Sequence, residues 1–381
     1  MMRINPSFLR ILTSVLILGG HMMASGQTLP DKAKVLKDME LANAYFVKKW
    51  PDPGLPIVMD KVRTSNLWTR AVYKEGLMEF YKITKNPSYL AYMTEWGERN
   101  KWGLWFGKES RHADSQLAGL TYLDLYLIDQ KPERIADIKY NIDKMVNSDK
   151  KNDWTWIDAI EMSMPVFAKL GVMYNDNRYF EKMHELYLHS RDVEGGGLYN
   201  KTEKLWWRDK DFVPPYKTPD GKNCYWSRGN GWVVAALVKV MEIIPENSPH
   251  YNEYKKDYLD LMAALLPLQR EDAFWNVSLA DPNHFGGKEL SGTALFCYGM
   301  AWGMNKGWLD KKKYLKPTVN AWNAMVKDGL HTDGMLGYVQ STGKEPKDGQ
   351  PLSYDKIANF EDYGLGCFLL AGTEIYNLKK K

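Results

Sequence analysis

The chain has 381 residues and a formal net charge of +4, from 51 Lys and Arg against 47 Asp and Glu. So small an excess gives no support for nucleic-acid binding. Three cysteines are too few for a disulfide framework, and Cys297 and Cys367 lie in apolar runs typical of buried thiols. The chain is rich in Trp and Tyr, whose flat faces fill large cores and also stack on sugar rings.

The first 26 residues are predicted to be a secretory signal peptide. Arg3 and Arg10 precede an apolar run at residues 11–18, and small residues at 24–26 form a cleavage site. This run is too short for a membrane anchor, and no later run reaches about 18 uninterrupted apolar residues. We therefore expect residues 27–381 to form one domain without membrane insertion, exported across the inner membrane to the periplasm.

The remainder predicts about twelve helices of two alternating kinds and little strand. Apolar side chains recur at helical spacing among charged ones at residues 135–145, 254–265 and 315–326. Runs that are apolar on nearly every side cover residues 117–128, 157–173, 232–244 and 294–304. A helix of the first kind lies at the surface, whereas one of the second kind must be surrounded. The alternation predicts an inner ring of helices enclosed by an outer ring.

The outer helices are predicted to begin with a polar turn followed by an aromatic and an aliphatic residue, as at 86–90, 177–180 and 312–315. Starts about 45 to 70 residues apart are typical of a helical-hairpin array. A tetratricopeptide solenoid is the alternative, but its units are about 34 residues long and lack long inserts. The connections at 195–230 and 269–291 are long, which usually indicates function.

Six short stretches rich in Trp, Tyr, Gly and carboxylates each lie just ahead of an apolar run. They are residues 68–73, 111–114, 154–158, 226–232, 289–293 and 362–366. If alternate helices form the inner ring, all six stretches meet at one rim and can build a single pocket. This pattern indicates an enzyme on a helical toroid.

Asp158 is the leading candidate for acid–base chemistry. It lies among Trp154, Trp156 and apolar residues at the start of a predicted inner helix, where desolvation raises the pKa of a carboxyl. From its position alone, Asp158 is equally well explained as a carboxylate that caps the helix. Asp114 holds the corresponding place on the preceding inner helix. Repulsion between two adjacent carboxylates would raise the pKa of one further and leave the other ionised.

Arg228 is the predicted cation for an acidic substrate, because a guanidinium binds a carboxylate with two hydrogen bonds. Gly229 and Gly231 beside it permit close approach of the backbone to a ligand. The alternative is an ion pair between Arg228 and Asp114 or Asp158. The glycines are too irregular for a phosphate-binding loop, which argues against a nucleotide site.

The sequence predicts no metal and no cofactor. His184 and His189 are five residues apart on an amphipathic helix, so they point to different faces. The other histidines lack ligand-like spacing, and no nucleophile elbow or catalytic Cys is evident. A metal-free acid–base mechanism is therefore expected.

With these residues the chain resembles glycoside hydrolase family 105, the unsaturated rhamnogalacturonyl hydrolases, which are related to family 88. The similarity runs from residues 68–72 through 156–158 and 227–232 to 368–372. The individual motifs are short, but their order and spacing are specific. The resemblance implies an all-α (α/α)6 barrel, which agrees with the ring predicted from periodicity.

The resemblance also implies a reaction: hydration of the C4=C5 double bond of a terminal unsaturated uronic acid, with release of the next sugar. In this family Asp158 would act as general acid and base, and Asp114 would position water or substrate. Arg228 and Trp232 match substrate-binding positions, and Tyr73 matches more weakly. Further residues predicted to bind the substrate are Trp156, Trp226, Asn230 and Asp209. The expected partner is an acidic oligosaccharide.

One segment departs from the family pattern. Pectin-type members carry a His before the Arg-Gly-Asn-Gly-Trp stretch, whereas residues 205–212 here contain the pair Arg208-Asp209 instead. This segment resembles relatives that act on ulvan or arabinogalactan side chains, so the resemblance does not identify the sugar that is joined to the terminal uronic acid. Two other functions also stay open: an ordinary inverting glycosidase, whose carboxyls stand about 6.5 to 9.5 Å apart, and a non-catalytic glycan-binding scaffold.

Overall fold

A computed structural model describes residues 29–379 of the chain. The predicted signal peptide lies outside the described residues. The helices are α1 (Lys32–Lys49), α2 (Trp68–Thr84), α3 (Pro87–Arg99), α4 (Ala113–Ile128), α5 (Ala136–Val146), α6 (Asp158–Tyr174), α7 (Asn177–Leu188), α8 (Ser227–Ile243), α9 (Tyr251–Leu265), α10 (Leu290–Asn305), α11 (Lys311–Ala324) and α12 (Asp362–Asn377). Strands β1 (Ile57–Val58) and β2 (Val62–Arg63) pair antiparallel.

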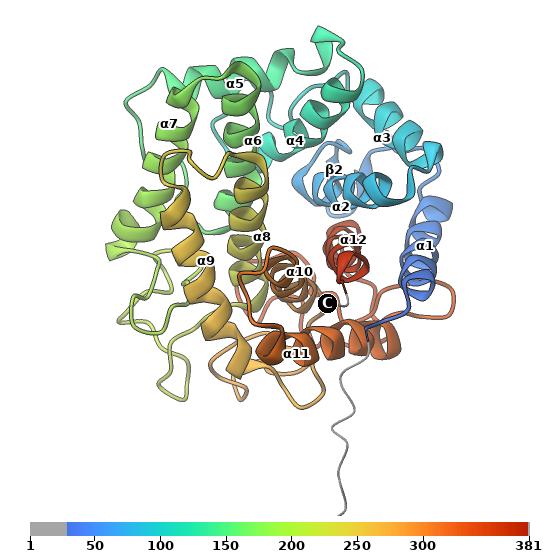
Figure 1. Ribbon diagram of the computed structural model, residues 1–381, viewed down its shortest axis with the longest axis vertical. Helices are drawn as coiled ribbons and strands as arrows, with labels where there is room; N and C mark the ends of the chain where they lie inside the picture. Colours follow the sequence, from blue (N-terminus) through green and yellow to red (C-terminus); the bar gives the residue numbers. More distant parts are fainter. Residues whose placement is uncertain (1–28, 380–381) are drawn as a thin grey trace, which may run out of the picture.

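The even-numbered helices form a closed inner ring. Each packs against the next along the chain, from α2 to α4 and onward to α12, and α12 packs against α2. The odd-numbered helices surround this ring, with α1 against α12, α7 against α6 and α9 against α8 (Figure 1). The predicted all-α (α/α)6 barrel is therefore confirmed. Among residues 29–379, no helix has both the length and the apolar character that a bilayer crossing requires.

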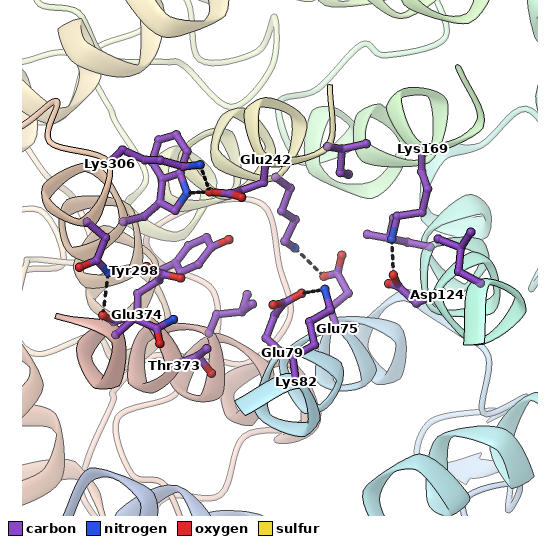
Figure 2. Close-up of a pocket in the computed structure, with 18 of the residues that line it drawn as sticks. Glu75, Glu79, Lys82, Asp124, Lys169, Glu242, Tyr298, Lys306, Thr373 and Glu374 are labelled. Carbon is purple, nitrogen blue, oxygen red and sulfur yellow. Dashed lines mark hydrogen bonds and ion pairs between the residues drawn. The ribbon is translucent and has the colours of Figure 1, made fainter. Parts of the chain in front are cut away.

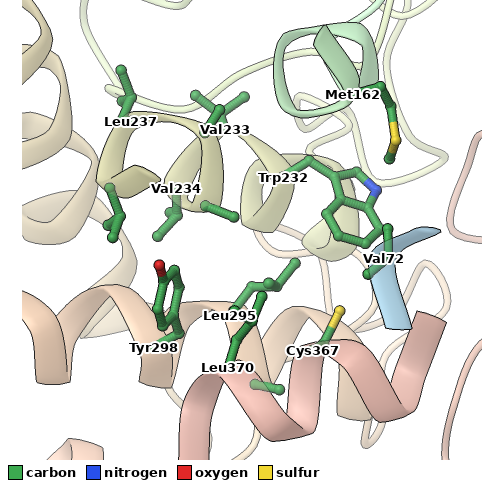
Figure 3. Packing of buried hydrophobic residues seen from close by; sticks show 14 of the residues in the cluster. Val72, Met162, Trp232, Val233, Val234, Leu237, Leu295, Tyr298, Cys367 and Leu370 are labelled. Carbon is green, nitrogen blue, oxygen red and sulfur yellow. The ribbon is translucent and has the colours of Figure 1, made fainter. Parts of the chain in front are cut away.

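Apolar side chains from the inner helices fill the middle of the barrel. Trp232 of α8 lies among Met162 of α6, Val72 of α2 and Cys367 of α12, and Leu295 of α10 completes the cluster (Figure 3). All five are buried, as helices apolar on every side require. The three cysteines are buried and unpaired, as predicted for Cys297 and Cys367.

The six predicted stretches contribute the first turns of the inner helices. The sequence prediction placed several helix starts too late: α4 begins at Ala113 rather than residue 117, and α8 at Ser227 rather than 232. Polar and glycine residues in a first turn resemble a loop, although free N–H groups there favour them. The predicted outer start at Pro87 is confirmed, with Asn86 capping α3 by accepting a 3.0 Å bond from the Ser88 amide.

The ring closes at a tight seam between its first and last helices. A Cβ on Gly366 would lie 2.3 Å from the Val72 carbonyl oxygen, and one on Gly76 would lie 2.4 Å from the Gly366 oxygen. Beside the seam, Arg70 Nε lies 3.0 Å from Asp362 Oδ2, and both side chains are buried. Backbone contact and a buried ion pair thus fix α2 against α12.

We predict that Gly366→Ala destabilises the protein by about 3 kcal/mol, because the added methyl must push backbone apart. Gly329→Ala, at the end of the helical turn that follows α11, is the control, since its methyl would meet only the tip of the Leu290 side chain, 3.0 Å away, at close range. The loss there should be about 1 kcal/mol or less, because alanine also favours helix. Urea unfolding measures both, and equal midpoints would contradict the seam argument.

Candidate active site

Asp158 occupies the first position of α6 and is held against the connection that precedes α8. The Ile157 amide donates a 2.9 Å hydrogen bond to the Arg208 carbonyl, and Trp156 forms a β-bridge with Asp209. Arg208 Nε donates to Asp158 Oδ2 at 3.2 Å. The Asp158 side chain is 12% exposed. It therefore lies just below the surface at the amino-terminal end of the barrel.

Asp114 lies in the first turn of the neighbouring helix α4, close enough for its charge to interact with that of Asp158. Its side chain is 21% exposed, and its carboxylate lies 3.9 Å from His112 Nδ1. The structure therefore brings the two predicted carboxyls together at one rim.

The two carboxyls have different electrostatic surroundings. Burial raises the pKa of Asp158, while the nearby charges of Arg208 and Arg228 oppose that rise. For Asp114 burial is again the largest cause, the charge of Asp158 adds to it, and the pKa reaches about 7. In the free protein Asp158 is thus the carboxyl that is hydrogen-bonded to a cation, whereas Asp114 has no such partner in the described part of the chain.

Asn230 and Asp209 hold this connection in place. Asn230 Oδ1 accepts a 2.9 Å bond from the Trp206 amide, and its Nδ2 donates to the Trp206 carbonyl at 3.0 Å. Asp209 accepts a 2.6 Å bond from Arg208 Nη1 and a 2.9 Å bond from the Asp211 amide. Both side chains are buried, so the structure gives these two predicted substrate-binding residues a positioning role.

Arg208 itself was not among the predicted site residues. It comes from a long connection without periodicity, so no helical spacing indicated where its side chain lies. The only signal in the sequence was its replacement of a family histidine.

Arg228 is placed differently from the sequence prediction. It is fully buried, and its guanidinium donates to the carbonyls of Gln340 at 2.9 Å and Ser341 at 3.1 Å and to the Tyr363 hydroxyl at 2.6 Å. It also lies over the Trp226 ring, 4.4 Å from the centroid. Within residues 29–379 Arg228 makes no ion pair with Asp114 or Asp158, although its charge acts on Asp158, and its binding of a substrate carboxylate stays a prediction. Arg208 makes the ion pair with Asp158 instead.

Three predicted aromatic residues lie beneath the rim surface. Trp226 is buried and donates from Nε1 to Gln340 Oε1 at 2.8 Å. Trp232 is fully buried under the half-buried Trp68, with ring centroids 6.3 Å apart. Tyr73 faces outward, where its hydroxyl donates to Asn43 of α1 at 2.7 Å. These placements give all three a packing role.

Other aromatic rings reach solvent beside the carboxyls. Half-buried Trp156 lies 4.9 Å from the exposed His112 ring, and His112 lies 5.4 Å from Phe106, which is 51% exposed. Trp105 stacks on Phe106 at 4.1 Å. Exposed aromatic faces next to paired carboxyls suit the apolar face of a sugar ring. Of this group Trp156 was a predicted substrate-binding residue and His112 belongs to the predicted rim stretch 111–114, whereas Trp105 and Phe106 lie in a connection that lacks a pattern.

A cavity of about 850 Å³ lies at the opposite end of the barrel, between the second halves of the inner helices (Figure 2). Its wall carries ion pairs that join Glu79 to Lys82, Asp124 to Lys169, Glu242 to Lys306 and Glu75 to Lys239. Six lysines and five acidic residues line the wall, so its excess charge is too small to select a charged ligand. Its size alone does not make it the reactive centre.

One histidine cluster was missed by sequence spacing. Atoms of His184, His250 and Glu253 lie within 4.8 Å of one another, between α7 and α9. The two imidazole rings are stacked face to face, 3.5 Å apart and 8° from parallel. Lone pairs in two parallel ring planes do not converge on one ion, and His184 Nδ1 already pairs with the Tyr254 hydroxyl at 3.1 Å. This geometry does not suit a metal centre.

A ring of inner helices with two neighbouring, largely buried carboxyls and exposed aromatic rings at one end defines a toroid of the glycosidase type. By sequence the chain belongs to glycosyl hydrolase family 88, whose model matches residues 39–379. The resemblance to the related families 105 and 88 is therefore confirmed.

Individual relatives agree with this assignment. The chain is 31% identical to an unsaturated 3S-rhamnoglycuronyl hydrolase from Formosa agariphila, over 82% of this chain and 85% of the relative. A glycosyl hydrolase family 88 structure from Bacteroides vulgatus superposes with a TM-score of 0.83 at 29% identity, covering 92% of this chain and all of that one. An unsaturated glucuronyl hydrolase specific for heparin, 12% identical, shares the fold with a TM-score of 0.68, covering 91% and 97% of the two chains.

The raised pKa of Asp114 makes stability depend on pH. The pKa of Asp114 is about 7 in the folded protein and has its ordinary value of 3.8 in the unfolded chain, so between these pH values the folded state holds a proton that the unfolded chain has lost. The contribution of Asp114 to the free energy of unfolding is therefore complete below this pH window and is lost as the pH rises through it. We predict that wild type loses about 2 kcal/mol more unfolding free energy than Asp114→Asn between pH 5 and pH 8. Urea titrations at each pH test this, and parallel curves would contradict it.

Proposed function

We propose that this protein removes a terminal 4,5-unsaturated uronic acid from oligosaccharides produced by polysaccharide lyases. It acts from the chain end by hydrating the C4=C5 enol ether. The observation that carries the proposal is the pair of carboxyls, buried Asp158 and partly buried Asp114, at the rim of a family 88 barrel. A relative named as an unsaturated 3S-rhamnoglycuronyl hydrolase supports this class of substrate.

In the proposed reaction Asp158 gives a proton to C4, and the π electrons form the new C–H bond. Positive charge then develops at C5 and is shared with the ring oxygen, where the nearby carboxylates stabilise it. Water adds at C5 and releases its proton to Asp158, so the residue serves as acid and then as base. The resulting hemiketal opens, which leaves a hemiacetal at C1 that expels the next sugar.

We predict that Asp158→Asn lowers turnover by about 10³-fold or more while the fold is kept, because the amide cannot donate this proton. The assay follows loss of the ultraviolet band of the conjugated enol acid in lyase digests. Asp137→Asn, which changes a first-turn carboxylate of the outer helix α5, is the control for helix capping and should keep full activity. If Asp158→Asn lowered turnover by less than about tenfold, Asp158 would not be the proton donor.

The same assay separates the alternatives. Release of a sugar without loss of the ultraviolet band would indicate an ordinary inverting glycosidase. No change on any lyase digest would indicate a glycan-binding scaffold. Unsaturated uronyl-rhamnose disaccharides are the first substrates to test, because two relatives are named for rhamnoglycuronyl substrates.

We also propose that the protein works in the periplasm, on the basis of the predicted leader at residues 1–26. Mass spectrometry of the chain recovered from a periplasmic fraction should find Gln27 at its amino terminus. Recovery of the uncleaved chain from the cytoplasm would contradict this location.

A further inference from the structure

We propose that Arg208 binds the carboxylate of the terminal uronic acid and, by doing so, leaves Asp158 free to take up the proton it donates. This inference rests on the function proposed above. It gives Arg208 two linked tasks, recognition of the acidic sugar and control of the proton donor.

Arg208 is the guanidinium at this rim that a substrate can reach. Its side chain is 20% exposed, whereas Arg228 is fully buried on carbonyl oxygens. Arg111 is similarly exposed at 19%, but it already makes a two-point ion pair with Asp153. Arg208 Nη2 makes no hydrogen bond within residues 29–379, since only Nε and Nη1 contact Asp158 and Asp209. One donor is therefore available for an incoming anion.

The two existing contacts of Arg208 differ in strength. Nη1 lies 2.6 Å from Asp209 Oδ2, while Nε lies 3.2 Å from Asp158 Oδ2, which is long for a charge-assisted hydrogen bond. Asp209 is further fixed by the Asp211 amide. A substrate carboxylate that competes for the guanidinium would thus displace Asp158 and leave Asp209 in place.

The backbone around Arg208 is anchored, so only its side chain needs to move. The Arg208 carbonyl accepts from the Ile157 amide at 2.9 Å, and the β-bridge from Trp156 to Asp209 joins the same segment to the start of α6. Asn230 fixes the backbone two residues earlier. A shift of the guanidinium toward the substrate leaves the position of Asp158 unchanged.

The electrostatic result favours a neutral Asp158. The charged and titratable groups around it are Asp114 and His112 on the α4 side, Arg208 and Asp209 in the connection, and Arg228 on α8. Loss of the Arg208 contact and arrival of a carboxylate both raise the pKa of Asp158. Asp114, with a pKa of about 7, can hold the proton in the free protein and pass it to Asp158, becoming the carboxylate that helps stabilise C5.

The test combines Arg208→Gln with the methyl ester of the unsaturated disaccharide, which lacks the carboxylate charge. For wild type the ester should have a kcat/KM about 100-fold lower than the acid, while Arg208→Gln should handle the two within about threefold. Arg208→Lys, which keeps the charge, should restore part of the preference for the acid. Equal losses on acid and ester in Arg208→Gln would overturn the proposal, because a residue that only supports the fold affects both alike.

A pH profile gives the second readout. The proton donor must be neutral, so activity falls as the pH rises through its pKa. In Arg208→Gln the falling limb of kcat/KM, which reports the free enzyme, should move to higher pH by about one unit, while the limb of kcat stays in place. An unchanged kcat/KM profile would contradict the coupling. If the wild-type protein left the ultraviolet band of every unsaturated acid unchanged, the proposed function itself would be contradicted. Failure of the Arg208 proposal is thus distinguishable from failure of the proposed function.

Discussion

The architecture depends on the contact that closes the ring. At the seam between α2 and α12 the backbones touch through Gly76 and Gly366, at distances that leave no room for a side chain. The Arg70–Asp362 ion pair is buried beside this contact and aligns the amino-terminal ends of both helices. A buried pair fixes register well because breaking it leaves an uncompensated charge. Once the seam is closed, the first turns of the inner helices must share one rim.

That closed rim determines the chemistry available to its carboxyls. Asp114 and Asp158 lie in first turns, where the helix dipole favours a charged carboxylate, while burial favours a neutral one. Burial is the largest effect on both residues. What distinguishes them is contact with a cation: Arg208 donates a hydrogen bond to Asp158, and Arg228 also lies near Asp158, whereas Asp114 is affected only by the charge of Arg208. The difference between proton holder and ion-pair partner is thus set by a connecting segment and not by the barrel.

The sequence predicted the barrel better than the surface of its site. Helical periodicity reports burial, so the alternation of amphipathic and wholly apolar segments was enough to separate outer from inner helices. The same argument placed Asp114 and Asp158 at one rim. It failed for Tyr73, five positions beyond Trp68, because more than one full turn separates them and Tyr73 faces α1.

Residue type alone does not report whether a side chain is buried. Arg228 has the chemistry to bind a carboxylate, yet it lies under the rim and satisfies carbonyl groups of the segment at Gln340 and Ser341. Nothing in the local sequence distinguishes a buried arginine from an exposed one. Arg208 lies in an aperiodic connection, so its contact with Asp158 follows only from the three-dimensional path of that connection.

The two ends of the barrel differ in how the charges of their side chains are balanced. Amino-terminal helix ends carry partial positive charge and carboxyl-terminal ends partial negative charge. At the far end the cavity wall carries charges of both signs: Lys82 in the last turn of α2 pairs with Glu79, and the last turns of the other inner helices contain no basic residue. At the near end the positive helix ends and Arg208 face two carboxyls that are not fully neutralised. Under the proposed function an anionic sugar binds at that end, and its arrival changes the charge balance around Asp158.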